Sequence, residues 1–250
     1  MRLLEAIPAD SSLHLGIVGA GGKTTFLFRL AREFPTPVIV SASTHLAKAQ
    51  LGFGDDTYTI THEEDIDQAF SRLNHPVSIF TGPIQEDGRA KGLSFELLTY
   101  LKNMTARRFY PMFIEADGSR MHPIKAPAEH EPALPGWVNS VAVVAGLSGL
   151  NHPLNSDWVH RPEVFARLSG LEIQDEINET ALAKVLVHPE GGLKSIPNGA
   201  RRIAILNQCD SADLLSSAIN ISRILLAEYD MVLACRLNDT ADPVKRILTR

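Results

Sequence analysis

A glycine-rich segment near the amino terminus, Gly19-Ala-Gly-Gly-Lys-Thr-Thr, connects an apolar run to an amphipathic run. The apolar run, His14–Val18, is typical of a buried strand, and the spacing of apolar residues over Lys23–Glu33 predicts a helix. Glycines allow positive φ angles and close backbone approach, so that N–H groups can surround phosphate oxygens. The helix that follows points its N-terminus at the same anion. The sequence therefore predicts a phosphate-binding loop between a strand and a helix.

The spacing of this loop fits two nucleotide-binding patterns. The common form, Gly-x-x-x-x-Gly-Lys-Thr, requires glycine at position 17, where this chain has Ile17. Gly19-x-x-Gly-Lys-Thr-Thr matches the loop of Mur-type ligases as well as it resembles a Walker A loop. In either form we expect Lys23 to reach the β- and γ-phosphates and Thr24 to ligate Mg²⁺. The alternative is a flexible glycine turn. The residues predicted to bind the nucleotide here are Gly19, Ala20, Gly21, Gly22, Lys23, Thr24 and Thr25.

Short apolar runs alternate with longer amphipathic segments along the chain, which is typical of parallel strands joined by helices. The predicted strands are His14–Val18, Val38–Ser41, Val77–Phe80, Met112–Glu115, Ser140–Val144, Arg202–Leu206 and Met231–Ala234. The predicted helices are Lys23–Glu33, Glu63–Leu73, Phe95–Asn103, Pro162–Leu168, Glu179–Leu186 and Ala212–Glu228. Two long stretches, Asp117–Trp137 and Ser148–His160, are predicted to contain no strand.

These patterns predict an α/β fold with a mostly parallel sheet flanked by helices, three-layered and like that of a P-loop NTPase. We expect one domain over residues 1–250, and a smaller C-terminal part after about residue 146 is the alternative.

The composition narrows the class of protein. Hydrophobic residues make up 44% of the 250, enough for a substantial core. The net charge of −5 gives no electrostatic case for a nucleic-acid partner. No apolar run is long enough to cross a bilayer, and the first ten residues lack the pattern of a signal peptide. Cys209 and Cys235 have no metal-ligand spacing and are interpreted as reduced thiols. We therefore expect a cytoplasmic protein with no nucleic-acid or membrane partner.

Two carboxylates mark the end of the predicted strand Met112–Glu115. A phosphate loop needs an acidic partner to hold magnesium, usually at the end of a neighbouring strand. Because side chains alternate along a strand, Glu115 and Asp117 point to the same side. They also lie at the carboxyl end of the strand, where ligands bind in open α/β sheets. We predict that Thr24 and Asp117 ligate Mg²⁺, with Glu115 as the second candidate, and that Lys23, Asp117 and Glu115 are catalytic. The alternative is an ordinary Asp-Gly turn.

Asn207-Gln-Cys-Asp210 follows the predicted strand Arg202–Leu206 and resembles the Asn-Lys-x-Asp motif by which GTPases recognise guanine. The carboxylate of Asp210 would accept hydrogen bonds from the ring N1–H and the exocyclic amine of guanine, and adenine lacks both donors in those positions. Gln208 stands where lysine is usual. Asn207 and Asp210 are therefore predicted to recognise the guanine base of a bound nucleotide. The alternatives are an Asx turn or, for Asp210, the N-cap of the next helix.

Further candidates lie in the loop after the acidic strand and at the end of the second strand. Arg120, Lys125, His130 and Glu131 are predicted to bind an anionic substrate, and the alternative is a solvated charged loop. The hydroxyls of the segment that ends in Thr44-His45 can bind phosphate or magnesium water, or Thr44 can cap a helix. The spacing of His122, His130, His152 and His160 fits no helix-face pattern of metal ligands, and these four are interpreted as scattered surface residues.

Together these motifs resemble the YqeC family, accessory proteins for selenium-dependent molybdenum hydroxylases. The resemblance rests on Val18–Thr25, Glu115–Arg120, Lys125–Pro132, His160–Glu163 and Asn207–Asp210. It implies a role in maturing a selenium or molybdenum cofactor, with a molybdenum hydroxylase or a cofactor-biosynthesis protein as partner. It also implies site roles for His160, Arg161 and Glu163, which by composition alone are a helix start.

The motifs and the resemblance together predict magnesium-dependent binding and hydrolysis of GTP or ATP. Hydrolysis would proceed by positioning and charge neutralisation, without a covalent intermediate. Two alternatives stay open. One is a Mur-ligase-like or kinase-like transferase that acts on a small substrate, and the other is a nucleotide-gated binding module without turnover of its own.

Overall fold

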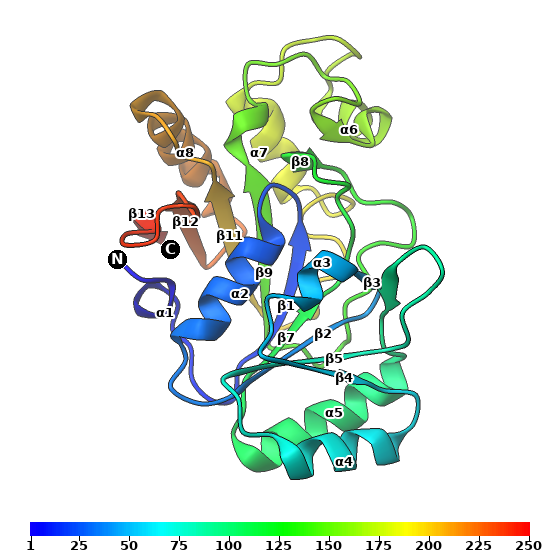
Figure 1. The fold of residues 1–250 in the computed structure, drawn as a ribbon. Coiled ribbons are helices and arrows are strands. Elements are labelled where there is room, and N and C mark those ends of the chain that lie inside the picture. Colours follow the sequence, from blue (N-terminus) through cyan, green and yellow to red (C-terminus); the bar gives the residue numbers. More distant parts are fainter.

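The computed structural model describes all residues, 1–250, and is built around one nine-stranded sheet (Figure 1). The strand order is β13-β12-β11-β9-β1-β7-β2-β5-β4, and every neighbouring pair is parallel except β12 with β13. Its strands are β1 (His14–Gly19), β2 (Val38–Ala42), β4 (Asp56–Thr59), β5 (Val77–Thr81), β7 (Met112–Glu115), β9 (Ser140–Gly146), β11 (Arg201–Asn207), β12 (Met231–Cys235) and β13 (Val244–Thr249). The α/β class and the mostly parallel sheet are thus confirmed.

Helices cover both faces of this sheet. They are α1 (Leu3–Ala6), α2 (Lys23–Glu33), α3 (Lys48–Leu51), α4 (Glu63–Arg72), α5 (Phe95–Arg108), α6 (Pro162–Ser169), α7 (Glu179–Val187) and α8 (Ala212–Leu225), with a short 3-10 turn at Leu147–Gly149. Two small ribbons lie beside the main sheet: β3 (His45–Ala47) with β6 (Arg89–Lys91), and β8 (Ile124–Lys125) with β10 (Val159–His160).

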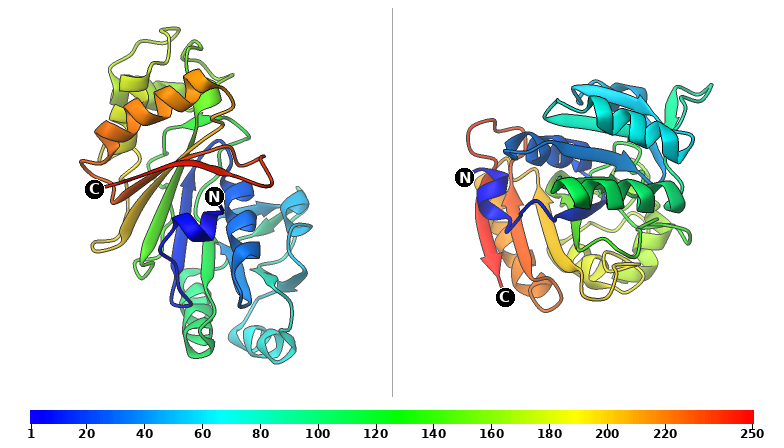
Figure 2. Two further views of the ribbon diagram at one scale, coloured as in Figure 1. Left: turned by 90° about the vertical axis from the view of Figure 1, so that its left-hand side faces the viewer. Right: turned by 90° about the horizontal axis from the view of Figure 1, so that it is seen from below.

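Two hydrophobic cores separate the layers. Because successive side chains of a strand point to opposite faces, Leu15 and Ile17 of β1 join the core under α1 and α2, whereas Val18 joins the core under α4, α5, α7 and α8. Burial on both faces explains why the central strands are nearly continuous apolar runs. Helix α1 lies beside β13, where the N–H of Val244 donates to the carbonyl of Met1, so the first helix and the last strand are neighbours (Figures 1 and 2).

The chain changes direction across the sheet at β1. From β1 it runs to β2, β4, β5 and β7 on one side, then crosses to β9, β11, β12 and β13 on the other. Ligands of open α/β sheets bind outside the carboxyl ends of the strands at such a switch point. The predicted phosphate loop leaves the carboxyl end of β1 and therefore lies there.

All seven predicted strands and six predicted helices are present, with shifted ends. Helix α5 continues to Arg108 beyond the expected Asn103, and α8 ends at Leu225 before the expected Glu228. The expectation that Asp117–Trp137 and Ser148–His160 contain no strand was wrong, because they hold β8 and β10, which pair with each other. No helix of the structure combines the length and the apolar character that a membrane span requires.

Candidate functional site

The Gly19–Thr25 loop has a backbone that only glycine fits at its centre. Gly21 and Gly22 have φ values of 75° and 130°, which L side chains rarely adopt. A Cβ on Gly21 would lie 2.4 Å from the backbone nitrogen of Gly146, and one on Gly22 would lie 2.4 Å from Nδ2 of Asn207. The loop is thus packed tightly against the ends of β9 and β11, and its shape is fixed by those neighbours.

Two groups of backbone N–H donors can be distinguished in this loop. Ala20 and Gly21 donate to the carbonyls of Val144 and His122, which anchors the loop. The N–H groups from Gly22 to Thr25, at the start of α2, have no acceptor within the protein. Four neighbouring donors at the positive end of a helix dipole are the arrangement that binds a phosphate group.

Lys23 and Asp117 meet directly, and both are buried. The Lys23 ammonium donates to the Gly19 carbonyl at 2.7 Å and lies 3.1 Å from Oδ1 of Asp117. The other oxygen, Oδ2, accepts from the Gly19 N–H at 3.0 Å and lies 2.7 Å from the Lys125 ammonium. Asp117 thus fixes the phosphate loop to the end of β7, and it is shared by two lysines.

The charges continue in an alternating row from Lys125 to the surface of a cavity. Lys125 lies 2.8 Å from Glu131, whose same oxygen lies 2.8 Å from Nη1 of Arg161. Burial disfavours ionisation of Glu131, but the hydrogen bonds from Lys125 and Arg161 outweigh it and lower its pKa to about 2. Next to this row, burial and then the charge of Arg161 lower the pKa of His160 to about 4, so that its imidazole is neutral at pH 7.

Thr24 and Glu115 face each other across the amide of Gln50. Nε2 of Gln50 donates to Oγ1 of Thr24 at 2.6 Å and to Oε2 of Glu115 at 3.0 Å. The Ala47 N–H donates to Oε1 of Gln50, which fixes the orientation of this amide. Burial raises the pKa of Glu115, and the nearby charge of Lys23 opposes this. The Thr24 hydroxyl and the Glu115 carboxylate thus lie on either side of one neutral amide NH₂ group, and both are oxygen ligands of the kind that Mg²⁺ prefers.

Asn207 lies beside the phosphate loop, at the end of β11. Its Nδ2 donates to the Gly21 carbonyl at 2.7 Å, and its Oδ1 accepts from the Leu237 N–H at 3.0 Å. The side chain therefore joins the loop to the segment after β12. Gln208, with a φ of 65°, accepts from the Ser148 hydroxyl at 2.7 Å.

Asp210 is exposed and lies 3.2 Å from Nε of Arg236. The alternative that Asp210 caps the following helix was wrong, because Ser211 is the N-cap of α8 and accepts from the Leu214 N–H. Recognition of guanine by Asn207 and Asp210 stays a prediction.

A large cavity of about 1750 Å³ opens beside Thr24 and Thr25, at the carboxyl ends of β7, β2 and β5. The β3–β6 ribbon, α3 and the loop after β7 surround it. Seven of the nine predicted substrate residues line it: Thr44, His45, Arg120, His130, Glu131, His160 and Arg161. These seven residues come from four separate stretches of the chain and share one cavity next to the predicted phosphate loop.

The family model described as YqeC protein matches residues 15–163. The chain belongs to the YqeC family. The Escherichia coli (strain K12) protein named Uncharacterized protein YqeC is 31% identical over 209 residues, which are 79% of this chain and 78% of that protein. No solved structure gives a significant match. The predicted family resemblance is confirmed, and the matched YqeC segment runs from β1 to Glu163.

Two predicted substrate residues of this YqeC-family chain lie apart from the cavity. Lys125 is buried in the charged row beside Asp117, and Glu163 is exposed in the first turn of α6. The alternative that Thr44 caps a helix was wrong, because β3 follows it and α3 begins only at Lys48.

Sequence reasoning missed Gln50 and the two basic residues of β6, Arg89 and Lys91, which also line the cavity. No motif marks a single glutamine. The alternation of Arg89-Ala-Lys91 is a strand signal too short to stand out.

No three His, Cys, Asp or Glu side chains come together as metal ligands, so a cation at Thr24 and Glu115 would complete its shell with phosphate and water oxygens.

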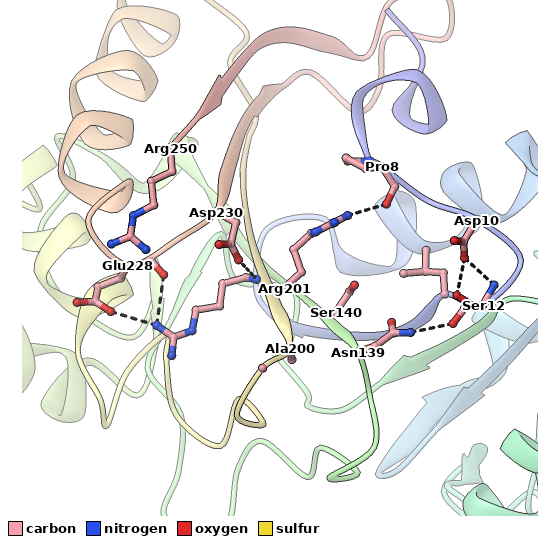
Figure 3. A pocket seen from close by; sticks show the side chains of 13 residues that line it. Pro8, Asp10, Ser12, Asn139, Ser140, Ala200, Arg201, Glu228, Asp230 and Arg250 are labelled. Atoms are coloured by element: carbon pink, nitrogen blue, oxygen red, sulfur yellow. Dashed lines mark hydrogen bonds and ion pairs between the residues drawn. The ribbon is translucent and has the colours of Figure 1, made fainter.

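A second pocket, of about 690 Å³, lies at the amino ends of β9 and β11 (Figure 3). The phosphate loop follows the carboxyl end of β1, which is parallel to β9, so it lies at the opposite end of the strands. Its charged groups are occupied by neighbours: Arg201 donates to the Pro8 carbonyl, Arg202 pairs with Glu228, and Asp230 accepts from the Arg202 N–H (Figure 3). These internal contacts leave the cavity beside Thr24 as the better candidate for a ligand.

Proposed function

We propose that this protein binds the magnesium complex of a nucleoside triphosphate, GTP or ATP, at the Gly19–Thr25 loop and hydrolyses it. The observation that carries the proposal is the convergence of four free N–H donors, the Lys23 ammonium, and the Thr24–Glu115 pair on one helix N-terminus. Each of the three groups suits one part of a metal–triphosphate complex. The N–H donors suit phosphate oxygens, the Lys23 ammonium suits the negative charge of the β- and γ-phosphates, and the Thr24–Glu115 pair suits the cation.

Thr24 and Glu115 would hold Mg²⁺, which when bound neutralises charge on the phosphate oxygens. The sequence favoured Asp117 for this role, and the geometry favours Glu115. Asp117 is shared by two ammonium groups and the Gly19 N–H, whereas Glu115 faces Thr24. The Gln50 amide would leave when the cation enters.

Lys125 makes it possible for Lys23 to turn toward a phosphate. A buried carboxylate that loses its only partner destabilises a protein strongly. Asp117 keeps Lys125 at 2.7 Å and the Gly19 N–H at 3.0 Å when Lys23 moves, so its charge stays compensated. Asp117 and Lys125 thus act as positioning residues for Lys23 and the loop.

The biological role that we propose is the maturation of a selenium- or molybdenum-cofactor hydroxylase. Membership of the YqeC family supports this role through the resemblance described above. The partner would be that hydroxylase or a protein of cofactor biosynthesis.

Titration calorimetry with ATP and GTP, each with and without Mg²⁺, tests the proposal. Lys23→Ala should weaken triphosphate binding by about 10- to 100-fold, the loss of a hydrogen bond to a charged group. Lys184→Ala, an exposed lysine of α7, is the control and should bind normally. Glu115→Gln should remove the magnesium dependence but keep magnesium-free binding. Unchanged binding in Lys23→Ala with an intact far-ultraviolet spectrum would contradict the phosphate site.

A second candidate function is transfer of the γ-phosphoryl group to a small substrate. The cavity favours it, because its volume exceeds the roughly 300–1,000 Å³ of ordinary ligand pockets. Product analysis separates the functions: free phosphate alone indicates hydrolysis, and a phosphorylated product indicates transfer. No turnover without a partner would indicate a nucleotide-gated binding module.

A further inference from the structure

One wall of the cavity is the cationic face of the β3–β6 ribbon. Lys91 lies directly opposite His45 in this ribbon, and Arg89 precedes Lys91 by two residues. Residues at that spacing share a face, so the three side chains lie together and line the cavity. Leu46 and Ala90, on the other face, are buried. The ribbon thus keeps its place by its apolar face and offers positive charge to the cavity.

Two of the cavity's cations have no partner in the protein. The Lys91 ammonium and the Arg120 guanidinium make no ion pair and donate no hydrogen bond, although both line the cavity. By contrast, Arg89 pairs with Asp87, and Arg161 pairs with Glu131. Arg120 belongs to the loop after β7, so the two unpaired charges come from different elements.

The side chains that line the cavity have a positive net charge, whereas the net charge of the whole chain is negative. The whole sequence has 29 Asp and Glu against 24 Lys and Arg. The basic side chains that line the cavity are Arg29, Arg32, Arg89, Lys91, Arg120 and Arg161, against the carboxylates Glu115 and Glu131. A cleft lined by one sign of charge concentrates ligands of the other sign.

The cavity also extends away from the side where the base is predicted to bind. Asn207 ends β11, which β9 and β1 separate from β7, β2 and β5 at the cavity. A triphosphate on the loop would therefore have its base on one side and the cavity on the other. The volume of about 1750 Å³ leaves room for a second molecule.

We propose that the cavity binds a second ligand beside the triphosphate, a small molecule with at least two phosphate or carboxylate groups. Lys91 and Arg120 bind its anionic groups, and Arg89 and His45 extend the contact along the ribbon. The assignment rests on the proposed function, because the nucleotide is the neighbour of this ligand.

Pyrenetetrasulfonate, a fluorescent tetra-anion, is the probe for this site. Its binding is measured by fluorescence with and without saturating magnesium and a non-hydrolysable triphosphate. The dye should bind in both conditions, more weakly at high salt. The double variant Lys91→Ala/Arg120→Ala should lose about tenfold or more in dye affinity and keep its triphosphate affinity. The double variant Arg223→Ala/Arg246→Ala, at exposed arginines of α8 and β13, removes the same charge as a control and should change neither affinity.

The outcomes separate this inference from the proposed function. Dye affinity unchanged in the double variant overturns the anion site. Displacement of the dye by the triphosphate, or a loss of triphosphate affinity in the double variant, shows that the cavity belongs to the nucleotide itself and also overturns it. Failure of the triphosphate to bind at all overturns the proposed function, and the dye titrations without nucleotide then still decide whether Lys91 and Arg120 form an anion site.

Discussion

At the scale of single residues, Gln50 occupies the position between Thr24 and Glu115 that we assign to a cation. Its two hydrogen bonds there, at 2.6 and 3.0 Å, must break when the metal enters. Gln50→Ala removes this competitor, so we expect the affinity for the magnesium–triphosphate complex to rise by up to about tenfold, one hydrogen bond to a charged group. Calorimetry with and without Mg²⁺ checks this. A change of equal size in magnesium-free binding would show that Gln50 acts on the loop instead.

His14 is a residue whose burial makes stability depend on pH. It packs edge-on against Trp137, its Nε2 has no hydrogen-bond partner, and burial, then the charge of Lys102, lowers its pKa to about 4. The unfolded chain binds this proton near pH 6.5 and the folded chain does not, so the free energy of unfolding falls as the pH drops from about 7 to 4. We expect this group to contribute on the order of 3 kcal/mol to that loss.

Denaturant titrations at pH 7 and pH 4.5 measure this contribution. His14→Phe keeps the aromatic contact with Trp137 and removes this titration, so the variant should lose less stability between the two pH values than the wild type. The part of the loss that comes from the lowered pKa of His160 is the same in both proteins. His62→Gln, at an exposed histidine, should behave as the wild type. Equal pH dependence in His14→Phe and the wild type would contradict the assignment. The window stays above the pKa of about 2 at Glu131, whose stabilising contribution is lost only below about pH 4.5.

The residues of the candidate site differ in how well sequence predicts them. Lys23 and Thr24 follow a glycine loop and Glu115 ends an apolar strand, so local patterns marked each of them, and the pairing of β1 with β7 brings them together. The hydrogen bonds of Gln50 depend on the tertiary path of α3, which no local pattern encodes.

At the scale of elements, the phosphate loop is joined to β11 and to the segment after β12 by one side chain. Asn207→Ala removes its bonds to the Gly21 carbonyl and the Leu237 N–H and leaves both groups without partners. We expect a loss of about 2–4 kcal/mol in the free energy of unfolding, because each unsatisfied buried group costs about 1–3 kcal/mol. The substitution also loosens the loop, so the affinities for ATP and for GTP should fall by the same factor.

Denaturant melts and calorimetry with both nucleotides check this prediction. Asp210→Ala is the matched variant at the other end of the motif, and its exposed pair with Arg236 should contribute less than about 1 kcal/mol. A selective loss of GTP affinity in Asp210→Ala would support guanine recognition. A selective loss of GTP affinity in Asn207→Ala, without loss of stability, would contradict the role that we assign to Asn207.

The elements that sequence analysis found are those with strong local signals. The interior strands are apolar on both faces, so their runs of Val, Ile, Leu and Ala were recognisable. The missed β3 and β6 have three residues each, with one buried residue between two exposed ones. Their pairing depends on contacts between segments far apart in the chain, such as His45 with Lys91, which single-sequence periodicity does not report.

At the scale of the whole molecule, one sheet carries both sides of the candidate site. Strand β9 ends at Gly146 and pairs with β1 on one side and with all seven residues of β11 on the other. A boundary at about residue 146 would therefore divide the sheet at a strand that is buried along its full length. An exposed edge of that kind is unstable and prone to aggregate.

We therefore expect the chain to unfold in one cooperative transition, and its two tryptophans report on the two sides of Gly146. Trp137 packs against His14 of β1, and Trp158 stacks on His152 at 3.5 Å. In the single-tryptophan variants Trp158→Phe and Trp137→Phe, denaturant curves followed by fluorescence and by circular dichroism should coincide in midpoint and slope. Two separate midpoints would instead show a C-terminal part that unfolds independently. Because the proposed nucleotide site uses Lys23 from one side of Gly146 and Asn207 from the other, the magnesium–triphosphate complex should raise one common midpoint.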